Sequence, residues 1–125
     1  MADTITSTTT TVLWLSRHAM SAEQEADLKV SLRAEALQVT SEEVTFGSDD
    51  VAEVEKLWLR AIRQGIAVVA GVFPASMAAE IGWFAASHHG NQHGVKFAIP
   101  KMKPAPAKEG EQRRTVHDKW RFFFC

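Results

Sequence analysis

The chain of 125 residues has a single cysteine, Cys125. One thiol excludes an intramolecular disulfide and a zinc site built from several cysteines, which favours a reducing compartment. A hydrophobic share of 46% and a charged share of 23% exclude a disordered or fibrous chain. We therefore expect a cytoplasmic globular protein.

Long hydrophobic runs are also absent. The longest strongly apolar stretch, Ile66 to Pro74, is far shorter than the about 20 residues of a membrane-spanning helix, so no membrane association is expected. The net charge of −1 lacks the basic excess typical of proteins that hold long nucleic acid. A nucleotide ligand is therefore expected to be small and locally bound. The sequence has neither G-x-G-x-x-G nor a Walker loop, so dinucleotide and nucleoside triphosphate binding have no motif support.

The length of the chain suits one domain, which we expect to span residues 11–125. Residues 1–10 are rich in threonine and lack the basic region and apolar segment of a secretory signal. They are predicted to form a flexible tail.

Four segments are predicted to be strands, at 11–15, 36–46, 66–73 and 95–99. The first and third are apolar on both faces, which is typical of central strands in a parallel sheet. Pro74 and Pro100 are expected to end the third and fourth strands, and 101–114 to form an exposed loop. The aromatic segment 116–124 is interpreted as a last strand that must bury Trp120, Phe122 and Phe124.

Three helices are predicted between these strands. Ser21 and Gln24 match a capping box, which starts a helix at 22–33. The second, at 50–64, has a clear apolar stripe, and the third covers 75–87. Alternating strands and helices predict an α/β, Rossmann-like fold with a mainly parallel sheet and helices on both faces. Ligands bind such sheets beyond the carboxyl ends of the strands, at the loops 16–21, 73–77 and 100–107.

The segment Ser16-Arg17-His18 follows the first buried strand and precedes the first helix. Arginine offers a fork for phosphate oxygens, histidine titrates near neutrality, and serine donates or orients. A helix N-terminus beside them would favour an anion. These three residues are the candidate catalytic group. In the alternative interpretation, His18 caps the strand and Arg17 is solvated.

Further candidates lie in the other two loops. Phe73, at the end of the central strand, is placed to stack on a base, and Pro74, Ser76 and Lys101 are predicted to contact the ligand. His89 and His93 have the i, i+4 spacing of metal ligands, but Gly90 and Gly94 disfavour a helix there. We therefore interpret 88–93 as a solvated loop and predict neither a metal nor a cofactor.

Two segments carry a resemblance to a known family. Leu13-Trp14-Leu15-Ser16-Arg17-His18 and the stretch from Val68 to Ile81, with its Gly-x-x-Pro-x-x-x-Ala-Ala-Glu pattern, resemble the small stand-alone CRISPR-associated ring nucleases with a CARF-like Rossmann fold. The resemblance implies binding and linear cleavage of a cyclic oligoadenylate, the second messenger of type III CRISPR systems, with cyclic tetra-adenylate as the expected ring.

The chemistry that this resemblance implies needs no metal. A ribose 2′-hydroxyl attacks its neighbouring phosphate while the protein holds the in-line geometry. Arg17 and Lys101 would neutralise phosphate oxygens, and His18 would act as acid or base. Because a symmetric ring is best enclosed by two copies of one loop set, a homodimer is expected.

Two alternatives remain open. Leu15-Ser16-Arg17-His18-Ala19 also resembles the histidine phosphatase motif, in which the histidine is transiently phosphorylated. The second histidine of that family would have to be His93 or His117. The third alternative is a sensor that binds a cyclic nucleotide without cleaving it.

Overall fold

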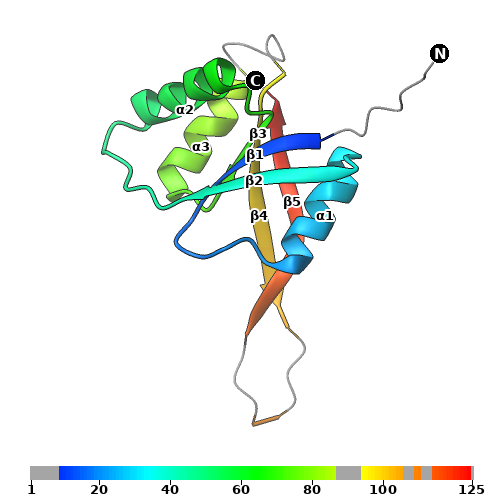
Figure 1. Cartoon of the computed structure of the whole chain (residues 1–125). Helices are drawn as coiled ribbons and strands as arrows, with labels where there is room; N and C mark the ends of the chain where they lie inside the picture. Colours follow the sequence, from blue (N-terminus) through cyan, green and yellow to red (C-terminus); the bar gives the residue numbers. More distant parts are fainter. Residues whose placement is uncertain (1–8, 87–93, 106–108, 111–113, 125) are drawn as a thin grey trace, which may run out of the picture.

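A computed structural model describes residues 9–86, 94–105, 109–110 and 114–124 of the chain. Helices and strands alternate, in the order β1 (Thr9–Leu15), α1 (Ala22–Leu32), β2 (Ala36–Glu42), α2 (Asp50–Gln64), β3 (Val68–Gly71), α3 (Ala75–Phe84), β4 (Lys96–Pro104) and β5 (Thr115–Phe124). One sheet has the strand order β2-β1-β3-β4-β5, as Figure 1 shows. Its first four strands are parallel, and β5 is antiparallel to β4. The predicted Rossmann-like α/β fold is confirmed.

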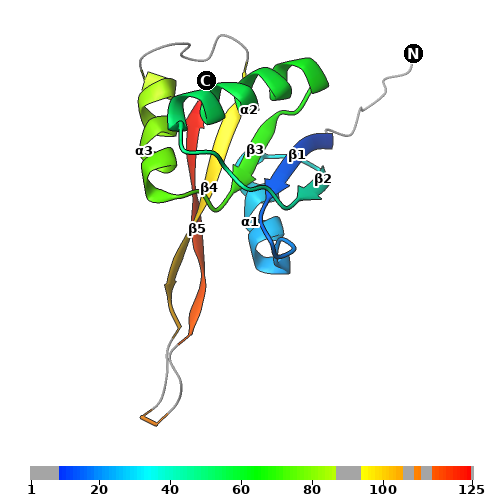
Figure 2. The ribbon, with the colours of Figure 1, turned by 90° about the vertical axis from the view of Figure 1, so that its left-hand side faces the viewer.

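The sheet has an apolar layer on each face, and helices cover both (Figure 2). Side chains of β1 alternate between the two layers, because successive residues of a strand point to opposite faces. Val12 and Trp14 join Leu28 of α1, whereas Leu13 and Leu15 join the layer under α2 and α3. The first and third strands are buried as predicted, and β3 is the middle strand. No helix among the described residues is long and apolar enough to cross a membrane.

The helix ends follow their sequence signals. Ser21 and Gln24 form the predicted capping box at α1, and Asp49 caps α2 by accepting from the backbone N–H of Ala52. Gly65 ends α2 in the left-handed conformation, with φ of 67°, which costs glycine little because it has no Cβ. The predicted stripe of α2 is buried at Val54, Leu57, Trp58 and Ala61.

The predicted loop after Pro100 is wrong in its first part. Strand β4 continues through Pro100 to Pro104 and pairs with β5 along this length. The pairing of β3 with β4 extends only to Ala70 and Ala98, so beyond Ile99 strand β4 has one neighbour. A proline is tolerated on such an edge because its missing N–H is not needed there. Lys101 therefore lies on a strand.

Other predicted boundaries shift as well. Strand β1 begins at Thr9, inside the predicted tail, and β2 ends at Glu42 rather than at residue 46. Strand β5 buries Trp120, but Phe124 is 48% exposed, with the Lys96 ammonium 5.7 Å from its ring centroid. The predicted burial of Phe124 is wrong because this residue ends the edge strand. Helix α3 ends at Phe84, and the predicted loop 88–93 lies outside the described residues.

Candidate functional site

A crevice opens where the chain leaves β1 and β3 in opposite directions. After β1 it passes to α1 on one face, and after β3 to α3 on the other face (Figures 1 and 2). Open α/β sheets bind ligands at such a switch point, where neighbouring connections diverge. A cavity of about 560 Å³ lies there, within the about 300–1,000 Å³ of small-molecule sites. Its lining residues are Leu15, Ser16, Arg17, His18, Val44, Thr45, Phe46, Val72, Phe73 and Pro74.

Gly71 permits the close approach of β3 to β1 beside this crevice. A Cβ atom at position 71 would lie 2.6 Å from the carbonyl oxygen of Leu15. That separation is shorter than any normal contact, so a side chain there would push the two strands apart. The glycine therefore keeps the loops after β1 and β3 adjacent.

The loop after β1 is held by hydrogen bonds to its backbone and leaves the side chains of Arg17 and His18 exposed. The Ser16 hydroxyl accepts a hydrogen bond from the His18 N–H, at 3.2 Å. The buried Trp14 indole donates to the His18 carbonyl oxygen, at 2.6 Å. The side chains of Arg17 and His18 remain exposed, and the described residues make no hydrogen bond to the His18 ring. The backbone is thus pre-organised while the imidazole and guanidinium are available to a ligand.

Two carboxylates at the end of β2, those of Glu42 and Glu43, have different contacts. Arg17 Nε lies 3.8 Å from Glu43 Oε1, with both side chains mostly exposed, so this ion pair is easily exchanged for a ligand. Glu42 instead receives two hydrogen bonds from the Arg60 guanidinium of α2, one of them 2.9 Å long. These bonds hold the pKa of Glu42 below its ordinary value. Glu42 is therefore a structural tether between β2 and α2.

An aromatic pair forms the opposite wall. The rings of Phe46 and Phe73 have centroids 5.7 Å apart. Phe73 is only 8% exposed, because its ring packs into the layer under α2 and α3. A base that entered the crevice would therefore contact the Phe46–Phe73 pair, because the Phe73 ring has no exposed face on which the base could stack.

The helix N-terminus at the crevice differs from the predicted one. We expected the start of α1 to favour an anion, but Ser21 and Gln24 already occupy it and neither lines the cavity. Helix α3 begins directly after Pro74, a lining residue, and no side chain caps it. The first N–H groups of a helix have no intrahelical acceptor, and their dipole attracts negative charge. Of the two helix N-termini, that of α3 is the one that begins next to the cavity.

Of the predicted ligand contacts, the structure brings Ser16, Arg17, His18, Phe73 and Pro74 to one cavity and leaves two outside. Ser76 is exposed on α3, and Lys101 lines a separate hollow on β4. Sequence reasoning missed the segment 44–46, which was assigned to a strand, and the anchoring role of Trp14. Neither had a local signal, because both roles depend on contacts between distant segments.

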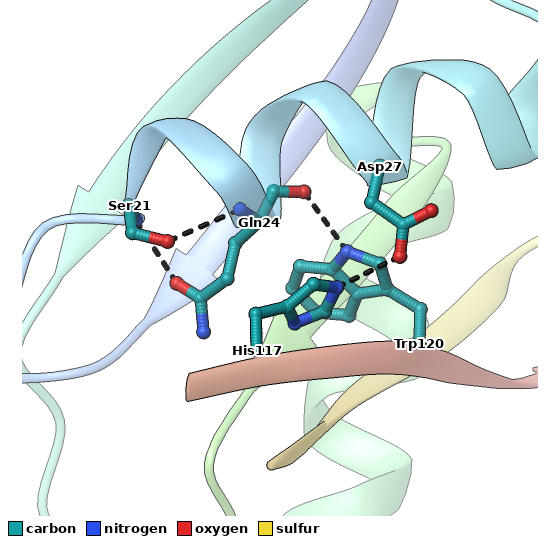
Figure 3. A network of polar contacts seen from close by, with 5 residues as sticks. All are labelled: Ser21, Gln24, Asp27, His117 and Trp120. Carbon is teal, nitrogen blue, oxygen red and sulfur yellow. Dashed lines mark hydrogen bonds and ion pairs between the residues drawn. The ribbon is translucent and has the colours of Figure 1, made fainter. Parts of the chain in front are cut away.

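His117 lies away from the crevice, in the contact between α1 and β5 shown in Figure 3. Its Nε2 is 2.7 Å from Asp27 Oδ2, and its side chain is 6% exposed. Its Nδ1 is buried without a hydrogen-bond partner. Beside it, Trp120 donates to the carbonyl oxygen of Gln24 at 2.9 Å. His117 therefore does not supply a second histidine to the crevice.

The described residues contain no group of three or more histidine, cysteine or acidic side chains that could hold a metal ion. The predicted His88–His93 segment lies outside them. No protein-family model matches the chain, and no curated protein matches it in sequence. Its function has to be inferred from the geometry of the crevice.

Proposed function

We propose that the protein binds a cyclic oligoadenylate at the crevice between β1 and β3 and cleaves it without a metal ion. One observation carries the proposal. Arg17 and His18 line a cavity that extends to Pro74, the residue before the uncapped N-terminus of α3, so a phosphate-binding side chain, a proton-transfer group and a helix N-terminus lie at or next to one space. A phosphodiester with an adjacent hydroxyl is the substrate class that uses all three.

The proposed reaction is an internal transesterification. A ribose 2′-oxygen forms a bond to the adjacent phosphorus, and the bond from that phosphorus to the 5′-oxygen breaks. The products are a linear oligoadenylate with a 2′,3′-cyclic phosphate and a free 5′-hydroxyl. The 2′-hydroxyl loses a proton and the leaving 5′-oxygen gains one, so no water, oxidant or metal is consumed.

Each proposed role follows from the position of a group. Arg17 exchanges its exposed contact with Glu43 for a phosphate oxygen, and its fork suits two oxygens at once. The N–H groups at the start of α3 stabilise the charge that develops on the phosphate. His18 transfers the proton, because its ring is exposed in the cavity and neutral imidazole can accept one.

A homodimer is part of this proposal. A ring of several nucleotides exceeds one open cavity, and α3 has an apolar side that nothing covers among the described residues. Ala75, Ala79 and Trp83 lie on this side, and Trp83 is 64% exposed. A contiguous apolar patch on the surface of a monomer often marks an interaction site. Two copies joined along α3 would bring both crevices together, since α3 starts at the crevice.

Light scattering tests the dimer. It should give a dimer for the wild type and a monomer for Trp83→Glu, and a wild-type monomer at every concentration would contradict the dimer.

A non-catalytic sensor is the second candidate. It is favoured by the absence of any described side chain that orients the His18 ring, since catalytic histidines are commonly held by a hydrogen-bonded partner. The phosphatase alternative has less support, because His18 is the only histidine among the described residues that line the cavity.

One experiment distinguishes these functions. The protein is incubated with cyclic tri-, tetra- and hexa-adenylate, with and without a chelator, and the products are separated and their termini identified. We expect cyclic tetra-adenylate to give linear products with 2′,3′-cyclic phosphate ends at an unchanged rate in chelator. Tight binding without products would identify a sensor. If the protein bound none of the rings but hydrolysed p-nitrophenyl phosphate, the ring-nuclease proposal would be overturned in favour of the phosphatase function.

A further inference from the structure

The end of β4 and the start of β5, which pair with each other, extend beyond the rest of the sheet, as Figures 1 and 2 show. Partners on adjacent strands share a face, so Trp120 lies with Pro100, and His117 with Met102, on the α1 side. The opposite face carries Ile99 beside Arg121, and Lys101 beside Lys119. Lys103, two residues along β4, lies on that same face. We name these four cations, Lys101, Lys103, Lys119 and Arg121, the ribbon cations.

The ribbon cations are not paired with any acidic side chain of the described residues. All four are exposed, and none forms a salt bridge or a hydrogen bond with another described residue. Asp118 sits at the bulge of β5 and forms no ion pair with them in the described structure. Like charges directly opposite each other, as at Lys101 and Lys119, destabilise a strand pair. The arrangement is therefore unfavourable for the isolated hairpin.

The net charge of −1 conceals a strong segregation along the chain. Residues 1–94 contain six basic and twelve acidic residues, whereas residues 95–125 contain eight basic and three acidic ones. The hairpin is thus a basic element on an acidic body. A positive potential is concentrated at one place, which attracts anions even when the whole protein is near neutrality.

Protection of an exposed sheet edge explains only part of this pattern. Lysine and arginine on an edge strand prevent pairing between molecules, which accounts for Lys119 and Arg121 on β5. Beyond Ile99 strand β4 has one neighbour, so the same protection also covers Lys101. It does not account for the hollow of about 290 Å³ that Ile99, Pro100, Lys101 and Arg121 line.

The hollow lies next to the crevice along the same edge of the sheet. Ala70 of β3 pairs with Ala98 of β4. Ile99 and Pro100, the next residues of β4, therefore lie beside the point where β3 passes into the loop 72–74. Neighbouring strands are only about 4.8 Å apart. Val72, which lines the crevice, is 64% exposed. A ligand chain that left the crevice over Val72 would therefore run toward the hollow.

We propose that Lys101 and Arg121, with Ile99 on the same face of the hairpin, form a second subsite that takes another phosphodiester group of the oligoadenylate bound in the crevice. The proposal rests on the proposed function and adds a determinant of ligand length to it. Arg121 supplies a planar fork for two phosphate oxygens and Lys101 a point charge. Ile99, which pairs with Arg121, supplies an apolar surface for a sugar or a base.

The test compares ligands of increasing length. The dissociation constant is measured for adenosine 5′-monophosphate and for linear oligoadenylates of two and four nucleotides, with 2′-O-methyl groups that block cleavage. In Lys101→Ala/Arg121→Ala the monophosphate should bind as in the wild type, and the tetranucleotide about 10- to 100-fold more weakly, because charge-assisted contacts to phosphate are lost. Lys29→Ala/Arg63→Ala removes the same charge from exposed helix positions and should change neither ligand by more than about twofold.

Three variants separate the two proposals. Thermal unfolding verifies that the ribbon variant is folded, and Lys101→Arg/Arg121→Lys should keep most of the affinity for the tetranucleotide. The subsite would be overturned if Lys101→Ala/Arg121→Ala and the control Lys29→Ala/Arg63→Ala lost the same affinity for the tetranucleotide. If Arg17→Ala still weakened the binding of every ligand, the proposed function would remain intact. If Arg17→Ala bound every ligand normally and only the ribbon variant lost affinity, the crevice would not be the site and both proposals would fail.

Discussion

Two of the five histidines lie among the described residues, and their surroundings are opposite. His18 has an exposed ring in a cavity, and its backbone is held by Ser16 and Trp14. His117 has a buried ring paired with Asp27 between α1 and β5. The two regions touch through an edge-to-face contact of Trp14 with Trp120, whose ring centroids are 5.9 Å apart. The comparison separates a histidine whose ring is exposed in a cavity from one that holds two elements together.

Removing the His18 ring should have the largest effect. His18→Ala is expected to reduce the rate of ring cleavage by about 10²–10⁴ while most binding remains, because a general acid or base contributes about that factor. Single-turnover assays with saturating protein measure the rate. The free energy of unfolding should not change, since the ring is exposed. Partial rescue by added imidazole would assign the loss to the ring, and normal cleavage by the variant would show that His18 is no catalytic residue.

Arg17→Ala should weaken binding rather than slow the reaction of bound ring. The expected loss in affinity is about 10- to 150-fold, because a charge-assisted contact contributes about 1.5–3 kcal/mol. Calorimetry with a 2′-O-methylated ring measures it. The matched control is Arg63→Ala, an exposed arginine in the last turn of α2, which should bind as the wild type does. Equal affinities of the two variants would remove Arg17 from the site.

A substitution in the Asp27–His117 pair should lower the stability of the protein and leave ring cleavage unchanged. Asp27→Ala leaves the His117 ring without its carboxylate, and an unsatisfied buried polar group costs about 1–3 kcal/mol. Urea unfolding should show this loss, whereas Glu25→Ala, on an exposed part of the same helix, should cost less. Cleavage at a temperature where both variants are folded should be unchanged. A lower rate in folded Asp27→Ala would mean that the tryptophan contact transmits strain to the His18 loop.

The smallest effect is expected at Glu42, near the crevice but outside its chemistry. The hydrogen bonds from Arg60 lower the pKa of Glu42 below the ordinary 4.5. A lowered folded-state pKa stabilises the fold above that ordinary value and loses its contribution as the pH falls through the lowered one. The wild type should therefore exceed Glu42→Gln by about 0.2–1 kcal/mol at pH 6. Urea unfolding at successive pH values should show this difference disappearing in acid, and a constant difference would contradict the assignment.

Local signals predicted the elements better than their ends. The capping box at Ser21, the stripe of α2 and the two-sided apolar character of β1 and β3 were each sufficient for a correct element. The error at Pro100 has a definite cause. A proline stops a strand only where its N–H is required, and this depends on how far β3 extends alongside β4.

The candidate site divides in the same way. The position of Ser16, Arg17 and His18 at a carboxyl edge followed from a buried strand that precedes a helix. The aromatic wall at Phe46, the anchoring by Trp14 and the choice of the α3 N-terminus over that of α1 did not follow. Each of these depends on which loops the sheet order brings together.

The sequence by itself determined the alternation of strands and helices, the two-sided burial of β1 and β3 and the place of the Ser16-Arg17-His18 loop after β1. Periodicity and capping act over a few residues, so they can be read without the fold. Only the tertiary structure decided that His18 is free while His117 is buried, and that Lys101 joins Arg121 rather than Arg17. Burial, and the pairing of side chains from distant segments, arise from the order of strands in the sheet, which no local pattern encodes.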